Sequence, residues 1–320
     1  MQGYNRIDTL VTIAKLYYEH HYSQNIIAKK LNLSRPYISK LLQEAREMGV
    51  VTITVNDPTQ AESWLEREIR QRFALRKVIV APRSVEEPIV SKVGAMCARY
   101  LSGIVSDDDV IGVSWGRTLH FCAQKLAQRH DLKGVTVVQV CGGMTNISRD
   151  IYASEIPLQF ADAFSGTPFC MPLPAVLDSV ALKEAVTADR NISRVLEIAK
   201  QCNIIVFTAG SFGQDCALAR AGYLSQEDVA RLKAKGAVGD ICCHIVNEEG
   251  KLVDPELDKR TVGIELGEIA GMSFRICVAE SNDKVKTICA ALRGGYANVL
   301  VTDEDTANAI LAHLDGTRSS

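Results

Sequence analysis

Signatures of several common protein classes are missing from this 320-residue sequence. No apolar stretch approaches the roughly 20 residues that a membrane-spanning helix needs. The first residues, MQGYNRIDTL, lack the basic-then-apolar pattern of a secretion signal, so we expect a cytoplasmic protein without membrane contact. The chain lacks the G-x-x-x-x-G-K-[ST] loop, and no G-x-G-x-x-G motif follows the first strand expected in its larger part. A nucleotide is therefore not the expected ligand.

The cysteine pattern gives no sign of a disulfide framework or a zinc site. None of the ten cysteines are spaced as C-x-x-C, and Cys242-Cys243-His244 does not match a zinc ligand set. The cysteines are scattered through apolar runs of a large chain. We therefore expect reduced core thiols and neither a metal nor a cofactor. An oxidation-sensitive or metal-contacting thiol is the alternative.

Charge is distributed unevenly along the chain. Residues 1–57 contain seven Lys or Arg and five Asp or Glu, a net charge of +2, which leaves -4 for the remainder of a chain whose total is -2. A length of 320 residues favours two domains. A small basic domain attached to a larger acidic one is typical of a protein whose terminus binds a polyanion.

The first 50 residues predict three amphipathic helices. The stripe of the first helix, which ends near His20, consists of Ile7, Leu10, Val11, Ala14, Tyr17 and Tyr18. Ser23 is the expected N-cap of a short helix over 24–31. After a three-residue turn, Ser34 is the expected N-cap of a third helix, with Pro36 in its first turn. The segment VVTITV (50–55) then alternates like the strand of a β-wing. This spacing predicts a winged helix-turn-helix domain over 1–57.

One side of the third helix carries polar and cationic side chains that are suited to binding DNA. Its apolar residues are Ile38, Leu41, Leu42 and Ala45, so its other side is polar. Short donors and one or two cations on a free helix face can enter a major groove. A solvated surface without a ligand is the alternative, but the helix-turn-helix spacing favours DNA. The expected DNA-binding residues are Gln24, Ser34, Arg35, Pro36, Tyr37, Ser39, Lys40 and Gln43.

The remainder of the chain predicts an α/β domain. A charged helix within 58–76 is expected to link the two domains or to pair two subunits. Short apolar runs then alternate with helical patterns, namely VIVA (78–81), VIGVSW (110–115), VTVVQV (135–140), FCMPLPA (169–175), IIVFTAG (204–210), RICVAE (275–280) and NVLVTD (298–303). Apolar strands separated by helices indicate a mostly parallel sheet that is buried on both faces. We therefore expect a Rossmann-like α/β domain over 77–320.

The segment GVSWGRTL (112–119) permits two interpretations. Ser114 with its flanking glycines, including Gly116, matches the G-x-S-x-G nucleophile elbow of serine hydrolases. The same loop with Arg117 and Thr118 also suits a phosphate at the start of a helix. No later histidine is a convincing partner for Ser114, and no HGGG-like segment precedes it. We therefore favour a loop that holds the anionic group of a small ligand.

Small residues follow two other strands as well. The segments are CGGMT (141–145) and AGS (209–211). Ligands of open parallel sheets bind beyond the carboxyl ends of the strands. We expect a binding crevice at that edge.

The whole chain resembles the SorC family of bacterial sugar-responsive transcriptional regulators. The resemblance is carried by SQNIIAKKLNLSRPYISKLLQEAREMGVVTI, GVSWGRTL, VVQVCGGM, AGYLSQED, KGAVGDICCHIVNEEGKLV and ALRGGYANVLVTDEDTA. It implies a DNA-binding protein whose body resembles phosphosugar isomerases and deaminases but serves as a sensor. The implied partners are operator DNA, as an inverted repeat, a phosphorylated sugar, and further copies of the chain in a homotetramer or dimer of dimers.

The resemblance also implies roles for residues of the body. Asp240 would accept hydrogen bonds from sugar hydroxyls, and Lys284 would pair with a phosphate or hydroxyl. Gly142, Gly143 and Thr145 would line the crevice, and a further candidate is Arg260.

An enzyme with an accessory DNA-binding domain is the rival hypothesis. A phosphosugar isomerase or deaminase would need a general base at the crevice, for which Asp240 or Asp178 is available. We favour a regulator of a carbohydrate-utilisation operon that is not an enzyme.

Overall fold

The computed structural model describes residues 6–20, 22–51, 62–143 and 152–318. Within it the chain divides into two compact units, Met1–Ala61 and Glu62–Ser320. Each unit has a hydrophobic core of its own.

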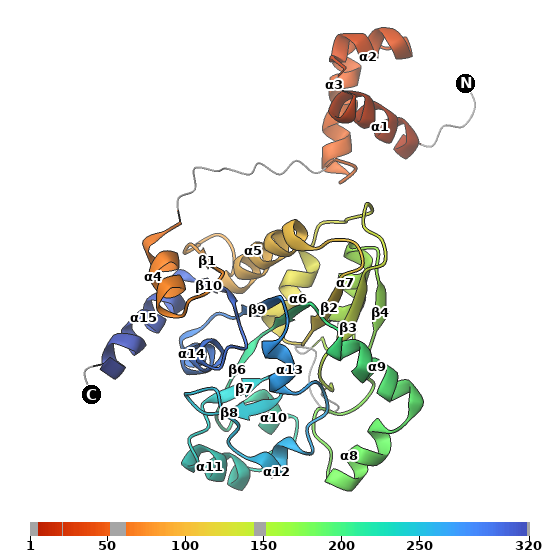
Figure 1. Cartoon of the computed structure of the whole chain (residues 1–320). Coiled ribbons are helices and arrows are strands. Elements are labelled where there is room, and N and C mark those ends of the chain that lie inside the picture. The colour runs from red at the N-terminus through yellow and green to blue at the C-terminus, as the bar shows by residue number, and fades with distance from the viewer. Residues whose placement is uncertain (1–5, 21, 52–61, 144–151, 319–320) are drawn as a thin grey trace. The chain divides into compact units, whose positions relative to one another are not determined.

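The first unit contains the three predicted helices (Figure 1). Helix α1 (Arg6–Ala14) continues into a π-helical turn, η1 (Lys15–Glu19), and is followed by α2 (Gln24–Leu31) and α3 (Arg35–Glu47). The N-caps are those expected, because the Ser23 Oγ accepts a hydrogen bond from the Ile26 amide and the Ser34 Oγ accepts one from the Tyr37 amide. The predicted wing strand over 50–55 lies mostly outside the described residues.

The core of this unit is small and almost wholly aliphatic. Its buried side chains are Leu10, Ile13, Ile27, Ala28, Ile38, Leu41, Leu42 and Ala45. The predicted stripe of α1 is wrong at Ile7, which is 46% exposed, whereas Ile13 is fully buried. The helical periodicity of the sequence predicts that one face of α1 is buried, but it does not fix which residues lie at the edge of that face. The packing of α1 on α3 decides this.

The second unit is built around a parallel sheet of seven strands. The strand order is β1-β10-β9-β5-β2-β3-β4, and every described pair is parallel. The strands are β1 (Lys77–Ala81), β2 (Val110–Val113), β3 (Thr136–Gln139), β4 (Thr167–Phe169), β5 (Ile204–Phe207), β9 (Phe274–Val278) and β10 (Val299–Asp303). The predicted α/β class with a mostly parallel sheet is thus confirmed.

One predicted strand is displaced. The sequence favours a strand over 169–175, but β4 ends at Phe169. Pro172 and Pro174 have no amide hydrogen to donate, so the segment after Phe169 cannot continue a regular ladder. It makes an isolated bridge between Pro174 and Gly143 instead.

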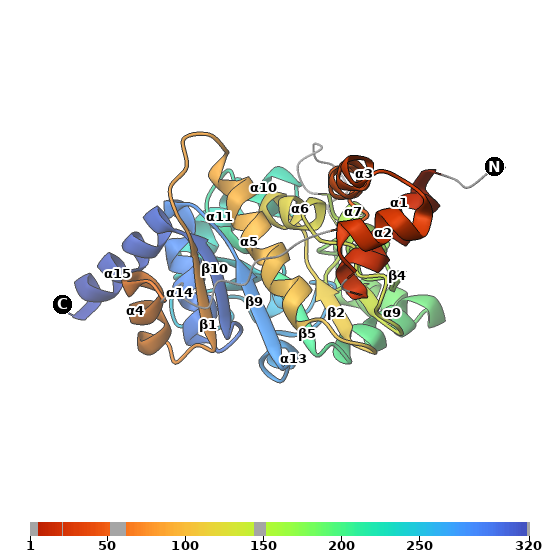
Figure 2. The same cartoon turned by 90° about the horizontal axis from the view of Figure 1, so that it is seen from above.

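Helices cover both faces of the sheet. Figures 1 and 2 show α5 (Ile89–Ile104) and α6 (Arg117–Gln124) on one side and α9 (Arg190–Lys200) and α14 (Val285–Arg293) on the other. Helix α7 (Glu155–Ala163) packs on α6, β3 and β4. Helix α4 (Trp64–Arg72), which falls in the predicted linker, packs on β1 and on α15 (Glu304–Arg318) and so belongs to the second unit.

A second, antiparallel sheet was not anticipated. It consists of β6 (Ala209–Ser211), β7 (Gly239–Ile241) and β8 (His244–Val246). Figure 1 shows it below the parallel sheet, among α10 (Ala217–Arg220), α11 (Gln226–Ala234) and α12 (Pro255–Asp258). Two further helices are α8 (Val180–Thr187) and α13 (Leu266–Ala270). Three-residue strands carry too little periodicity to be recognised from sequence.

A buried histidine joins this small sheet to its surroundings. The His244 Nδ1 faces the Asp258 carboxylate at the end of α12, and its Nε2 lies 2.8 Å from the Ile264 carbonyl oxygen. Both partners accept hydrogen bonds, so the ring satisfies both by carrying a proton on each nitrogen. Burial opposes the charged ring, but Asp258 and the Ile264 carbonyl outweigh it, and the pKa of His244 is raised.

We expect His244→Gln to lower the free energy of unfolding by about 3 kcal/mol when the histidine is charged, since removing one member of a buried pair leaves the other uncompensated. The stabilisation should be complete below about pH 6.5 and be lost as the pH rises through the raised pKa of His244. Urea unfolding at several pH values measures it. The exposed His130→Gln is the control, and a pH-independent effect of His244→Gln would contradict the charged pair.

Candidate functional site

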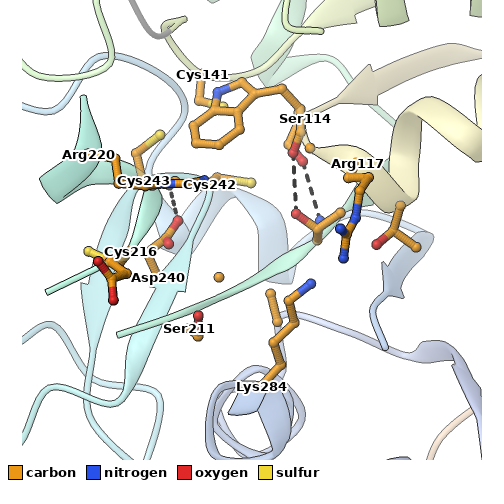
Figure 3. Close-up of a pocket in the computed structure, with 18 residues that line it drawn as sticks. Ser114, Arg117, Cys141, Ser211, Cys216, Arg220, Asp240, Cys242, Cys243 and Lys284 are labelled. Carbon is orange, nitrogen blue, oxygen red and sulfur yellow. Dashed lines mark hydrogen bonds between the residues drawn. The ribbon is translucent and has the colours of Figure 1, made fainter. Parts of the chain in front are cut away.

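A cavity of about 310 Å³ opens at the carboxyl ends of the parallel strands. The loops after β2 and β5 supply much of its lining, together with the β6–β8 sheet and the start of α14 (Figure 3). β2 and β5 are neighbours in the sheet, and the chain continues from β2 to β3 and β4 on one side but from β5 to β9 and β10 on the other. The cavity therefore lies at the point where the strand order reverses, which is the usual ligand site of such sheets.

Hydrogen bonds hold the two loops together. The Ser114 amide donates to the Val206 carbonyl at 3.1 Å, and the Ser114 Oγ accepts from the Thr208 amide at 3.4 Å. The Thr208 hydroxyl donates to the Trp115 carbonyl at 3.3 Å. Gly116 then caps α6 with a φ of +132°, and a Cβ there would lie 3.2 Å from the Thr208 Oγ1. A glycine is needed at that position both for its conformation and for the close approach.

Three cations line the cavity. Arg117, at the first position of α6, is 64% exposed, and its guanidinium lies 3.6 Å from the buried Glu280 carboxylate. Arg220 ends α10, and Lys284 immediately precedes α14. Within the described ranges no ion pair or hydrogen bond occupies the side chains of Arg220 and Lys284, so both are available to an anion.

A buried carboxylate lies across the cavity from Arg117 and Lys284 (Figure 3). The Asp240 Oδ2 accepts a hydrogen bond from the Cys243 amide at 3.1 Å. Burial raises the pKa of Asp240 to about 6, a shift that the Cys243 amide and Lys284 only partly offset. Gly210 on β6 makes room for this carboxylate, since a Cβ there would lie 1.9 Å from the Asp240 Oδ1.

Six of the residues predicted for the effector site line this cavity: Ser114, Gly116, Arg117, Thr118, Asp240 and Lys284. They come from the loop after β2, from α6 and β7, and from the turn before α14, which are distant in sequence. Thr145 lies outside the described residues.

The other predicted residues do not line the cavity. The Gly142 carbonyl accepts a hydrogen bond from the Trp115 indole at 2.9 Å, and a Cβ on Gly142 would lie 2.4 Å from the Pro174 oxygen. Gly143 pairs through its backbone with the 173–175 segment. Arg260 donates to the Leu177 carbonyl at 3.1 Å. The two glycines allow close backbone contact beside the end of β3, and Arg260 holds the backbone at Leu177. Both residue types also occur in ligand sites, which is why the sequence did not distinguish these roles.

Twelve further lining residues were not among the predicted site residues. They are Trp115, Cys141, Thr208, Ala209, Gly210, Ser211, Asp215, Cys216, Ala217, Arg220, Cys242 and Cys243. Signals were available for several of them, because Trp115, Cys141 and Ser211 stand in the strand-end segments GVSWGRTL, CGGMT and AGS. Cys242 and Cys243 stand in KGAVGDICCHIVNEEGKLV, which carries the resemblance. Residues such as Arg220 on α10 had no such signal, since the position of this helix depends on the tertiary fold.

Ser114 has no histidine partner among the described residues. The His120 Nε2 contacts Gln124, and its ring stacks on Tyr152 with centroids 3.6 Å apart. Both nitrogens of His244 are engaged by Asp258 and Ile264. Ser114 acts as a link between two strand ends, which agrees with the preference for a holding loop over a nucleophile elbow.

The residues predicted to contact DNA lie on one helix-turn-helix surface. Arg35, Pro36, Tyr37, Ser39, Lys40 and Gln43 are exposed on α3, and Ser34 is its exposed cap. Gln24, the first residue of α2, is half-buried. Ile38, Leu41 and Leu42 occupy the opposite side of α3 in the core. The exposed side of the helix is therefore mostly polar, and Arg35, Lys40 and Arg46 are its cations.

The described part of the chain has neither a membrane-spanning helix nor a metal-binding cluster. No helix in it is both long and apolar enough to cross a bilayer. No group of three His, Cys, Asp or Glu side chains in it is arranged to hold a metal ion.

The fold and the cavity define a class of protein: a helix-turn-helix unit combined with an α/β unit that binds a small ligand at its strand ends. Residues 57–312 match the family described as "putative sugar-binding domain". The deoxyribonucleoside regulator of Bacillus subtilis is 39% identical over 306 residues, which cover 95% of this chain and 97% of that protein.

Further relatives extend the similarity over the whole chain. The sorbitol operon regulator of Klebsiella pneumoniae is 30% identical over 97% of this chain and 100% of its own. The crystal structure of full-length SorC from the same organism matches with a TM-score of 0.74 over 97% of this chain and 100% of that one. A domain of a possible sugar-binding regulator from Arthrobacter aurescens matches 80% of this chain at 27% identity, with a TM-score of 0.72. The chain belongs to the SorC family of sugar-responsive transcriptional regulators.

The raised pKa of Asp240 makes a prediction about stability. The folded protein binds a proton at Asp240 up to about pH 6, whereas the unfolded chain releases it near the ordinary value of 3.8, so stability falls as the pH rises between these values. We expect Asp240→Asn to be more stable than the wild type by about 3 kcal/mol above pH 7, since each pKa unit corresponds to about 1.4 kcal/mol.

Chemical denaturation across this pH range tests it, with the exposed Asp162→Asn as the control. The difference between Asp240→Asn and the wild type should vanish below the ordinary aspartate pKa. A difference that persists unchanged at low pH would show that the effect is not one of ionisation.

Proposed function

We propose that the cavity binds a phosphorylated sugar and that this ligand controls the affinity of the helix-turn-helix unit for operator DNA. The observation that carries the proposal is the arrangement of charge, with Arg117 and Lys284 on one side of the cavity and Asp240 on the other. A ligand with an anionic end and a hydroxyl-bearing body matches this arrangement.

The phosphate is assigned to the start of α6. The amides that begin this helix are free of helical partners, and the Arg117 guanidinium and Lys284 ammonium lie beside them. Arg117 is only loosely engaged by Glu280 at 3.6 Å, so a phosphate can compete for it. The hydroxyls are assigned to Asp240, whose carboxylate accepts hydrogen bonds when ionised.

Two relatives suggest which sugars to try. One is named for deoxyribonucleosides and another for sorbitol. A cavity of about 310 Å³ is at the small end of the usual range for ligand sites, which suits a single sugar phosphate. Deoxyribose, ribose and sorbitol phosphates form the first panel.

For the sugar to control transcription, its binding must change the affinity of the helix-turn-helix unit for DNA. A ligand that binds one arrangement of subunits more tightly shifts the population toward it. We propose a symmetric oligomer, a homotetramer or dimer of dimers, that reads an inverted repeat. The exposed face of α3 supplies base and phosphate contacts, with Arg35 and Lys40 among its cations.

A phosphosugar isomerase or deaminase remains the second candidate, and one observation favours it. A carboxyl group with a pKa of about 6 is well matched to general base catalysis, and Asp240 has that value beside the proposed sugar. Asp178, the other base considered, does not line the cavity. Sustained turnover of sugar phosphates by the purified protein, lost in Asp240→Asn, would favour the enzyme over the regulator.

Arg117→Ala should weaken sugar-phosphate binding about ten- to a hundred-fold, because it removes a charge-assisted hydrogen-bond donor. Thermal shift with the panel and with the unphosphorylated sugars measures it, since a ligand of the folded state raises the melting temperature. Arg190→Ala is the matched control, since Arg190 is the exposed first residue of α9. DNA binding should be unchanged in both variants. An unaltered shift in Arg117→Ala would remove this loop from the phosphate site.

Lys40→Ala should weaken binding to promoter DNA and make the slope of log affinity against log salt shallower by about one unit, as expected for one lost phosphate contact. Fluorescence anisotropy over a salt series measures this. Lys15→Ala, an exposed lysine of η1, is the control. Equal slopes for Lys40→Ala and the wild type would place the DNA on another surface.

A further inference from the structure

Three thiols meet on the wall of the cavity. Cys141 follows β3, and Cys242 and Cys243 form the turn between β7 and β8; all three line the cavity (Figure 3). Cys141 has none of its surface exposed and the two turn cysteines have at most 4%, and the cavity that all three line is the open space nearest to them. The proposed function gives these thiols no role.

The turn that carries two of them is unusual. Ile241 pairs with His244, which leaves Cys242 and Cys243 as the two central residues of a β-hairpin turn, with φ values of +49° and +72°. This left-handed conformation is normally given to asparagine and glycine, because a Cβ strains it. Strained side chains of this kind concentrate at functional sites. The strain here brings two sulfur atoms to the cavity wall beside Cys141.

The three thiols differ in their readiness to ionise. Hydrogen bonds from the Cys242 and Cys243 thiols hold the pKa of Cys141 well below its usual value, despite its burial. Their hydrogen bonds to Cys141, together with burial, raise the pKa of Cys242 and Cys243 well above the usual value. Cys141 is thus the thiol of the cluster that ionises most readily, and the turn places two further thiols next to it.

We propose that Cys141, Cys242 and Cys243 form a peroxide-sensitive site in which Cys141 is oxidised and then forms a disulfide with one cysteine of the turn. The Cys141 thiolate attacks one peroxide oxygen, so that an S–O bond forms, the O–O bond breaks and hydroxide leaves. A turn thiol then attacks the resulting sulfenic acid, so that an S–S bond forms, the S–O bond breaks and water leaves. The hydroxide takes up the proton that Cys141 released on ionising, so two thiols are oxidised in all and one peroxide is reduced to two waters.

The disulfide would also change the sugar site, a consequence that rests on the proposed function. The Cys243 amide donates to the Asp240 carboxylate at 3.1 Å, so a turn drawn toward β3 moves the hydrogen-bond partner of Asp240. Oxidation then disturbs the group assigned to the sugar hydroxyls. The regulator would respond to peroxide as well as to sugar.

The chain contains a matched control pair. Cys97 and Cys122 are also hydrogen-bonded thiols, and both are fully buried, but neither lines the cavity. If access through the cavity and the low pKa of Cys141 decide the reaction, this pair stays reduced while Cys141 is oxidised.

The experiment treats the reduced full-length protein with hydrogen peroxide, blocks the remaining thiols with iodoacetamide and digests with trypsin without reduction. Mass spectrometry should find the peptide 134–149, which contains Cys141, joined to the peptide 236–251, which contains Cys242 and Cys243. The joined fraction should exceed that of the Cys97 and Cys122 peptides by roughly ten-fold and disappear after dithiothreitol. Cys141→Ser should abolish the link, and Cys97→Ser should leave it.

Three results would overturn the proposal. They are peroxide oxidation without the joined peptides, equal joining of the Cys97 and Cys122 peptides, or a disulfide confined to the peptide 236–251. The wild-type digest decides all three even if Cys141→Ser does not fold. None of these readouts needs a sugar, so a failed sugar site and a failed thiol site are distinguishable. If both proposals hold, peroxide should remove the sugar-phosphate thermal shift and dithiothreitol should restore it.

Discussion

The parallel direction of all seven strands is the constraint on which the remaining structure depends. It gathers every carboxyl end at one edge of the sheet, and the reversal of strand order beside β2 opens a gap between the loops after β2 and β5. Ser114 and Thr208 tie these loops together by hydrogen bonds and so set the width of the gap. The small antiparallel sheet then closes the cavity from outside the parallel sheet.

Several groups at or beside the cavity do not serve stability. On its wall, Asp240 is buried with a raised pKa, and Cys242 and Cys243 occupy a turn suited to asparagine and glycine. Beside it, Glu280 has a buried carboxylate oxygen without a hydrogen-bond partner among the described residues, and its carboxylate lies 3.6 Å from Arg117. Local rules are broken at the cavity while the hydrophobic core of the α/β unit obeys them, a pattern expected of a binding site. Charge that is poorly satisfied in the folded chain is available to a ligand.

Local patterns predicted most of the secondary structure. The serine caps and apolar spacings located α2 and α3, and six of seven apolar runs gave strands of the sheet. These succeeded because capping and burial on both faces act within a few residues. Predictions failed where contacts with distant parts of the chain decide whether a residue is buried or a segment forms a strand. Ile7 on α1 and the proline-containing segment after Phe169 are the examples.

The amino-acid sequence alone determined the class of this protein, a helix-turn-helix followed by a parallel α/β domain, and the loop GVSWGRTL that lies at its site. Only the tertiary structure decided that Gly142 and Arg260 support the backbone instead of the cavity, and that Arg220 and Cys216 line it. Sequence periodicity reports which way a side chain faces within its own element. Which elements meet at the strand ends depends on the order of strands in the sheet, which no local pattern encodes.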